Sequence, residues 1–201
     1  MKKTLILIAV AAALALVPAS SMAGIATTAH DLSGKGWGTD QICVFCHTPH
    51  NAKAEQIIPL WNHGARTSTS YTLYTSTTLD AGPLGQPVGV SKACLSCHDG
   101  VTAIDSYGAR TGSNYMTGDN TVGRSNTLAD DHPISFTWPT TDTGLYTPSS
   151  GKVGTLQLPL YGTGNDQMEC GSCHDVHNNA HAPFLRAANA ASALCLNCHN
   201  K

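Results

Sequence analysis

The chain has 201 residues, of which 12% are charged and 6% aromatic, and it contains 19 glycines and 10 prolines at a formal net charge of −2. The scarcity of basic residues argues against a nucleic-acid-binding protein, which normally presents a basic face. Few large apolar side chains are available for a dense core, so another apolar component must fill the interior.

The first 23 residues have the pattern of an export signal. Lys2 and Lys3 form a charged start, residues 5–17 form an apolar run, and small residues at 21–23 favour cleavage before Gly24. A membrane anchor is the alternative, but the apolar run is short and is followed by Pro and Ser. We therefore expect residues 1–23 to be a cleaved signal peptide.

The mature chain, residues 24–201, is expected to be one exported domain, periplasmic or extracellular, with the extracellular location favoured. Without the two signal lysines, the mature chain has nine basic and 13 acidic side chains, which gives it a formal charge of −4. No later segment is apolar enough to predict a membrane span.

The predicted elements are short and are separated by loops. We expect a strand or hairpin over residues 66–79, irregular structure with a few short strands over residues 101–168, and the most helical stretch over residues 187–199. Short helices are expected at four Cys-x-x-Cys-His motifs, and Gly100 is placed to end the second of them. The candidate capping residues are Thr39 or Asp40 for the first helix, Ser91 for the second, and Asn165 or Asp166 for the third.

These four motifs contain every cysteine of the chain. The cysteines are Cys43, Cys46, Cys94, Cys97, Cys170, Cys173, Cys195 and Cys198, and the histidines that follow them are His47, His98, His174 and His199. Two thiols at this spacing can form thioethers with the vinyl groups of one heme, and the adjoining histidine can ligate its iron.

Zinc binding and disulfide bonds are the alternatives for paired cysteines. Neither explains why a histidine follows the second cysteine in all four cases. We therefore predict a tetraheme cytochrome c with four covalently bound heme c groups. The fold is expected to be mostly irregular, with short α-helices and a few short β-strands, and with the hemes forming the core.

The second iron ligands are predicted from the remaining histidines and methionines. The mature chain has only two methionines, Met116 and Met168, so methionine could serve at most two hemes. Six histidines remain, which is enough for all four. We expect bis-histidine ligation throughout, which gives low reduction potentials.

Four of these histidines rank first as distal ligands. His50 and His177 each lie three residues after an attachment histidine, about one helical turn away, and can reach a neighbouring heme. His132 precedes a proline that favours extended backbone, and His63 follows a tryptophan able to pack on a macrocycle. His30 and His181 are the weaker candidates.

Residues 169–199, which hold the last two motifs, resemble the doubled Cys-x-x-Cys-His module of bacterial multiheme cytochromes. Further segments are similar, in order, to OmcE-type tetraheme cytochromes, so that the resemblance spans essentially the whole mature chain. They are His-Asp-Leu-Ser at 30–33, Cys-Val-Phe-Cys-His-Thr-Pro-His at 43–50, Pro-Leu-Trp-Asn-His at 59–63, Cys-Leu-Ser-Cys-His-Asp-Gly at 94–100 and Asp-His-Pro-Ile-Ser-Phe at 131–136.

The resemblance implies an extracellular subunit that associates head-to-tail into a conductive filament, with redox proteins and extracellular acceptors such as metal oxides as partners. In such filaments one axial histidine can come from the next subunit. His50 is the first expectation for that ligand and His30 the second. A head-to-tail contact that does not close builds fibres.

Electron transfer without bond-making chemistry is the leading function, because every iron position can be filled by histidine. The protein is therefore not expected to be an enzyme. Two alternatives stay open: a monomeric periplasmic tetraheme shuttle, and a small heme reductase with one five-coordinate iron.

Overall fold

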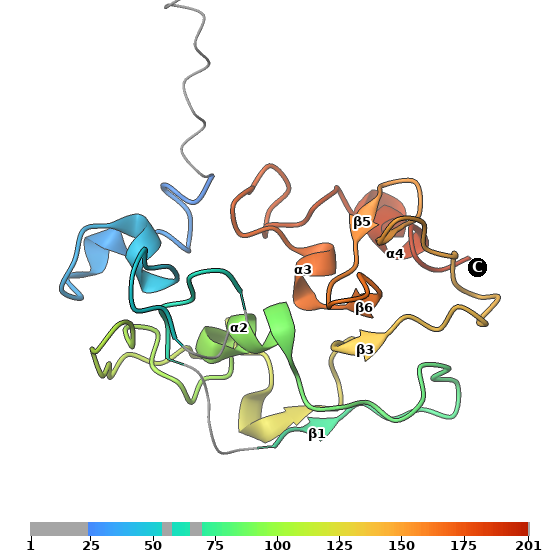
Figure 1. Cartoon of the computed structure of the whole chain (residues 1–201), viewed down its shortest axis with the longest axis horizontal. Coiled ribbons are helices and arrows are strands. Elements are labelled where there is room, and N and C mark those ends of the chain that lie inside the picture. The colour runs from blue at the N-terminus through green and yellow to red at the C-terminus, as the bar shows by residue number, and fades with distance from the viewer. Residues whose placement is uncertain (1–23, 54–57, 65–69, 201) are drawn as a thin grey trace, which may run out of the picture.

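The computed structural model describes residues 24–53, 58–64 and 70–200 (Figure 1). The predicted signal peptide, residues 1–23, lies outside this part of the chain, as do residues 66–69 of the predicted strand region. Most of the described chain is loop, interrupted by short helices and two-residue strands, which confirms the predicted irregular fold.

The regular elements are few and short. In chain order they are the 3-10 helices η1 (Ser33–Lys35) and η2 (Ile42–Phe45), strand β1 (Thr72–Leu73), helix α2 (Gly89–His98), 3-10 helices η3 (Gly118–Asn120) and η4 (Arg124–Asn126), strands β2 (Thr127–Leu128), β3 (Phe136–Thr137), β4 (Lys152–Val153), β5 (Leu158–Pro159) and β6 (Gln167–Met168), helix α3 (Cys170–Cys173), 3-10 helix η5 (Ala190–Ser192) and helix α4 (Ala193–Leu196).

The strands form three separate pairs. β1 and β2 are parallel, with Thr72 opposite Thr127, whereas β3 pairs antiparallel with β6 and β4 with β5. The strand expected within residues 66–79 is present as β1, but residues 70–79 form no hairpin, because β1 pairs with a strand far along the chain. The short strands expected in residues 101–168 are confirmed.

The helix starts differ from the predicted caps. The residue before α2 is Val88 rather than Ser91, the residue before α3 is Glu169 rather than Asn165 or Asp166, and η2 is preceded by Gln41 rather than Thr39 or Asp40. The cap prediction considered only the local sequence, whereas the carboxylate that accepts the Ser91 N–H, at 3.0 Å, belongs to Glu169, 78 residues away.

Of the predictions for helix extent, the stop at Gly100 is confirmed and the long helix over residues 187–199 is wrong. Gly100 follows α2 in the left-handed region (φ 71°), as predicted for a helix stop. Residues 187–199 are not the most helical stretch, since α4 covers only four residues while α2 covers ten. Ala191 and Ser192 have positive φ angles just before α4, which breaks the helix there.

Within the described residues, two clusters of buried apolar side chains stand out, with other buried apolar residues such as Phe45 and Trp61 outside them. The larger contains Trp138, Val153, Leu158, Leu160, Met168, Leu194 and Cys198, and the smaller contains Tyr71, Leu95 and Leu128. Helices α2 and α3 meet near the middle of the molecule (Figure 1). Within the described residues no helix has the length and apolarity needed to cross a bilayer.

Candidate functional site

Each Cys-x-x-Cys-His motif folds into about one helical turn. The backbone N–H of the histidine donates to the carbonyl of the first cysteine at 2.8 Å for His47, 3.0 Å for His174 and 3.0 Å for His199, and the second motif ends the helix α2. In a helical turn, residues three apart lie on the same face. The two thiols of each motif are therefore presented together, with the histidine directly after them.

Backbone carbonyls orient three of the attachment histidines through Nδ1. The Nδ1 atom lies 3.1 Å from the Pro59 carbonyl oxygen in His47, 2.8 Å from that of Asn120 in His98, and 3.1 Å from that of Pro183 in His174. A carbonyl only accepts hydrogen bonds, so Nδ1 carries the proton and the lone pair of Nε2 is left for a metal. Sequence reasoning missed these carbonyl partners, which lie 9 to 22 residues away and have no side-chain signal.

Three attachment histidines each face a second imidazole. The ring centres are 6.0 Å apart for His30 and His98, 6.2 Å for His47 and His177, and 6.5 Å for His132 and His199. Two imidazoles on opposite faces of one iron have ring centres about 6 Å apart, because each metal–nitrogen bond is about 2 Å long and each ring centre lies about 1 Å beyond its nitrogen. The separations of these three pairs are therefore those expected for two histidines on opposite sides of one heme iron.

The environment of His30 suits a neutral ligand. Burial, together with the neighbouring imidazoles of His98, His174 and His177, lowers the pKa of His30 to about 4. Its Nδ1 is buried and has no hydrogen-bond partner, and its ring meets Phe184 edge-on at 4.5 Å. A buried polar atom without a partner is costly unless another group satisfies it. The weaker sequence candidate thus has a geometry compatible with iron ligation.

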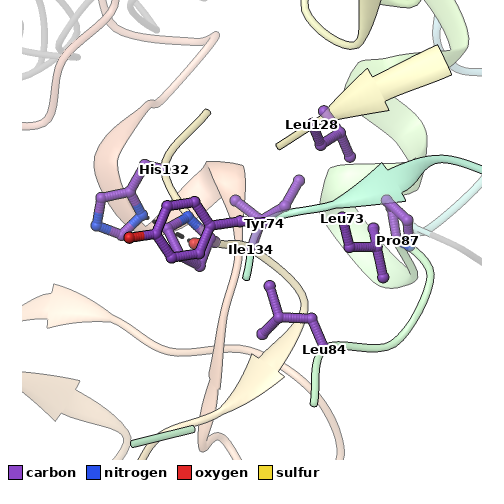
Figure 2. A pocket seen from close by; sticks show the side chains of 8 residues that line it. Leu73, Tyr74, Leu84, Pro87, Leu128, His132 and Ile134 are labelled. Atoms are coloured by element: carbon purple, nitrogen blue, oxygen red, sulfur yellow. Dashed lines mark hydrogen bonds between the residues drawn. The ribbon is translucent and has the colours of Figure 1, made fainter. Parts of the chain in front are cut away.

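His132 lies at an apolar pocket between β1, β2 and the loop before β3 (Figure 2). Its Nδ1 is held 2.8 Å from the Pro133 carbonyl oxygen, so Nε2 is the nitrogen available to a metal. The pocket is lined by Leu73, Tyr74, Leu84, Pro87, Leu128, His132, Pro133 and Ile134.

The attachment histidine of the third motif, His174, makes no ring contact with another imidazole in the part of the chain that the structure describes. Its side chain is exposed, and so are those of His50 and His181, neither of which faces an attachment histidine there. His63 is fully buried, and both of its ring nitrogens lie within hydrogen-bonding distance of backbone carbonyls. Met168 belongs to the larger apolar cluster.

The attachment cysteines follow one another in space in chain order. Before heme is attached, the pKa of the Cys97 thiol is raised to about 12, mainly by burial and next by the nearby Cys46 thiol. A hydrogen bond with Cys170, followed by burial, raises the pKa of Cys94. Such electrostatic effects require short separations. The first site is therefore close to the second, and the second close to the third.

The third and fourth sites are neighbours as well. Burial raises the pKa of Cys173, with Cys170 and Cys195 contributing, and burial followed by Cys173 raises the pKa of Cys198 to about 11. Each attachment site is thus next to the one that follows it in the chain, and His177, which follows the third site, also lies beside His47 of the first. All eight cysteines are described and none is in a disulfide, and the described residues contain no cluster of three or more side chains that could hold a metal ion directly.

Comparison with known families matches residues 164–201 to the doubled CXXCH motif. This match supports a multiheme c-type cytochrome module with covalently bound heme, and it indicates an electron-transfer cytochrome rather than an enzyme. A search of curated proteins finds no match.

Proposed function

We propose that this protein is an exported electron-transfer cytochrome with four covalently bound heme c groups, each ligated by two histidines. The observation that carries the proposal is the set of three imidazole pairs with ring centres 6.0 to 6.5 Å apart, each containing one motif histidine. Each bound heme supplies a one-electron redox centre of low potential, and bis-histidine ligation leaves no position for a substrate.

The distal ligands follow from the pairing. His177 serves the first site, His30 the second and His132 the fourth, while the cysteines fix each macrocycle and the backbone carbonyls orient the attachment rings. Because successive attachment sites are neighbours, electrons are expected to pass from one heme to the next within the chain.

Heme content and spin state test this proposal. A pyridine hemochrome assay is expected to give four hemes per chain, and the optical spectrum is expected to be that of low-spin heme. Fewer than four hemes would contradict the tetraheme proposal, and a protein without any heme would point to the zinc or disulfide alternative.

We further propose that His50 of a second copy completes the third site and that the protein polymerises head-to-tail as an extracellular filament. The support is that His174 and His50 are both exposed and that, within the described residues, neither ring makes a ring contact with another imidazole. The same observation favours a second candidate function, because a monomer with an open position opposite His174 could act as a small reductase. Carbon monoxide binding to one ferrous heme of a stable monomer would support that candidate.

Electron microscopy of the secreted protein, combined with two variants, separates these possibilities. His50→Ala is expected to abolish or weaken filaments with four hemes still attached, whereas His181→Ala is expected to leave filaments unchanged. Normal filaments from His50→Ala would rule out the crossing ligand. Monodisperse particles from the wild type, with no filaments, would favour the monomeric periplasmic shuttle.

A further inference from the structure

The fourth attachment turn, residues 193–199, packs against the hairpin formed by β4 and β5, which comes much earlier in the chain. Val153 of β4 and Leu158 of β5 are buried in the larger apolar cluster together with Leu194 and Cys198, so that β5 lies beside α4 (Figure 1). Of the eight cysteines, all of which the structure describes, Cys198 alone is buried. The hairpin and the fourth attachment turn therefore share one interior.

Asn197, which directly precedes Cys198, is hydrogen-bonded to this hairpin through both ends of its side-chain amide. The residue is 4% exposed. Its Nδ2 donates to the Val153 carbonyl at 2.9 Å, and its Oδ1 accepts from the Leu156 N–H at 2.7 Å and from the Thr155 hydroxyl at 3.4 Å. A buried amide with partners at both ends has a fixed orientation. The side chain of Asn197 thus holds the attachment turn against the hairpin.

The hairpin approaches the turn most closely at Gly154. Its φ angle is 67°, and a Cβ atom at this position would overlap the carbonyl oxygen and the Oδ1 atom of Asn197. Only glycine combines this backbone angle with the absence of a side chain. The close approach at Gly154 and the amide bonds of Asn197 are therefore two parts of one contact.

A second segment holds the residues that follow Asn197. The Tyr146 N–H donates to the Cys198 carbonyl at 2.9 Å, and the Asn200 N–H donates to the Gly144 carbonyl at 2.8 Å. His199 lies between these two bonds in the chain. Its backbone is therefore fixed by neighbours on both sides.

The imidazole pair at the fourth site has the steepest angle between its rings. The ring planes of His132 and His199 are inclined by 72°, whereas the pairs at the second and first sites have angles of 52° and 25°. The bond between Nδ1 of His132 and the Pro133 carbonyl fixes one ring of the fourth pair. The angle therefore depends on how the attachment turn holds the other ring.

We propose that Asn197 is a positioning residue of the fourth site, which holds the attachment turn on the β4–β5 hairpin and so keeps the His199 ring nearly perpendicular to that of His132. The inference rests on the proposed function, since it requires a heme attached at Cys195 and Cys198 between these two rings. Asn197 acts through the backbone that it shares with the two residues after it.

The angle between axial imidazoles has a spectroscopic signature. In low-spin ferric heme, parallel ring planes separate the energies of the two iron orbitals that share the unpaired electron, and the largest g value falls. Nearly perpendicular planes leave these orbitals close in energy and give a larger g value. We expect electron paramagnetic resonance of the oxidised, heme-loaded wild type to show such a large-g signal from the fourth heme. The signal is assigned by its loss in His132→Ala.

Asn197→Ala removes all three side-chain hydrogen bonds to the hairpin. It is expected to move the large-g signal of the fourth heme to lower g, with four low-spin hemes still attached, because the ring of His199 is no longer held near the perpendicular. Asn200→Ala, at an exposed asparagine of the same segment, is the matched control and should leave the signal unchanged.

Gly154→Ala tests the same contact from the hairpin side and is expected to shift the same signal, because the added methyl group displaces the hairpin from Asn197. Gly36→Ala is its control, since Gly36 has a similar φ angle of 71° but nothing within 4 Å of an added Cβ atom. It introduces comparable backbone strain without the overlap, and should leave the signal in place.

The outcomes separate this inference from the proposed function. A wild type without a large-g signal would overturn the inference, and so would an unchanged signal in Gly154→Ala, or shifts in the two controls as large as those in Asn197→Ala and Gly154→Ala. Each of these results leaves four hemes per chain and the cytochrome assignment intact. Fewer than four hemes in the wild type would instead contradict the proposed function itself.

Discussion

The state of each imidazole in this protein is set by what its nitrogens touch. The attachment rings of His47, His98 and His174 have one nitrogen bound to a carbonyl and the other left free, which suits a metal ligand. His63 instead has a backbone carbonyl oxygen within hydrogen-bonding distance of each nitrogen, so its buried ring is held by the backbone on both sides. The residue type is the same in each case, and the surrounding backbone gives it different chemistry.

Removing one distal histidine should change the spin state of only the heme that it ligates. We expect His132→Ala to retain four hemes and to convert the heme attached at His199 from low to high spin, because alanine cannot ligate iron. His30→Ala should do the same for the heme attached at His98, and the double variant should show two high-spin hemes. Electron paramagnetic resonance and optical spectra measure the number of high-spin hemes. Four unchanged low-spin hemes in either single variant would refute that ligand role.

The buried carboxylate of Asp105 should make stability depend on acid pH. Burial opposes its ionisation, but hydrogen bonds from Asn114 and Arg110 prevail and lower the pKa of Asp105. A lowered pKa in the fold contributes stability above the unfolded value of about 3.9, and this contribution is lost as pH falls through the folded pKa.

Asp105→Asn is therefore expected to lower the free energy of unfolding by about 1–3 kcal/mol at pH 7, because buried donors lose their acceptor. The difference in free energy of unfolding between the variant and the wild type should shrink below about pH 4. Denaturant unfolding followed by circular dichroism at both pH values measures it. The exposed Asp119→Asn is the matched control. Equal effects of the two substitutions would contradict this role.

At the scale of elements, Glu169 joins the second and third attachment helices. Its carboxylate accepts from the Ser91 N–H and the Ser135 hydroxyl, both at 3.0 Å, and it forms a capping box with Ser172 at the start of α3. This contact brings Cys94 beside Cys170. The spacing of the two central hemes is therefore expected to depend on one buried side chain.

Glu169→Ala is expected to lower the free energy of unfolding by about 1–3 kcal/mol, because buried donors are left without an acceptor. Glu169→Gln keeps an acceptor oxygen and should cost less. Burial raises the pKa of Glu169, so the wild type should gain stability as pH falls through that raised pKa towards the unfolded value of about 4.3, and the glutamine variant should lack this gain. Thermal unfolding at pH 7 and 5 measures both effects. Equal losses for alanine and glutamine would contradict the capping role.

At the scale of the whole molecule, the protein part of the interior is small. The larger apolar cluster has seven buried side chains, and the smaller has three. Loops connect almost all elements, so little regular backbone bonding holds the parts together. Four macrocycles would add the missing apolar surface between the clusters.

The chain without hemes is therefore expected to lack fixed tertiary structure. Expression without heme attachment should give a protein with weak near-ultraviolet circular dichroism and poor dispersion of its amide resonances, in contrast to the heme-loaded form. Cooperative unfolding of the heme-free chain, with a midpoint close to that of the loaded protein, would contradict a core built on heme.

The sequence by itself determined the attachment chemistry and the irregular fold, because a Cys-x-x-Cys-His motif acts within one helical turn and because Gly, Pro, Ser and Thr limit regular structure through local preferences. It did not predict the cap at Glu169, the break before α4 or the pairing of His30 with His98. These features depend on contacts between residues far apart in the chain, or on backbone angles that such contacts impose. The tertiary structure alone shows which histidines face each other, because the free energy of each pairing comes from packing and buried hydrogen bonds that no local pattern records.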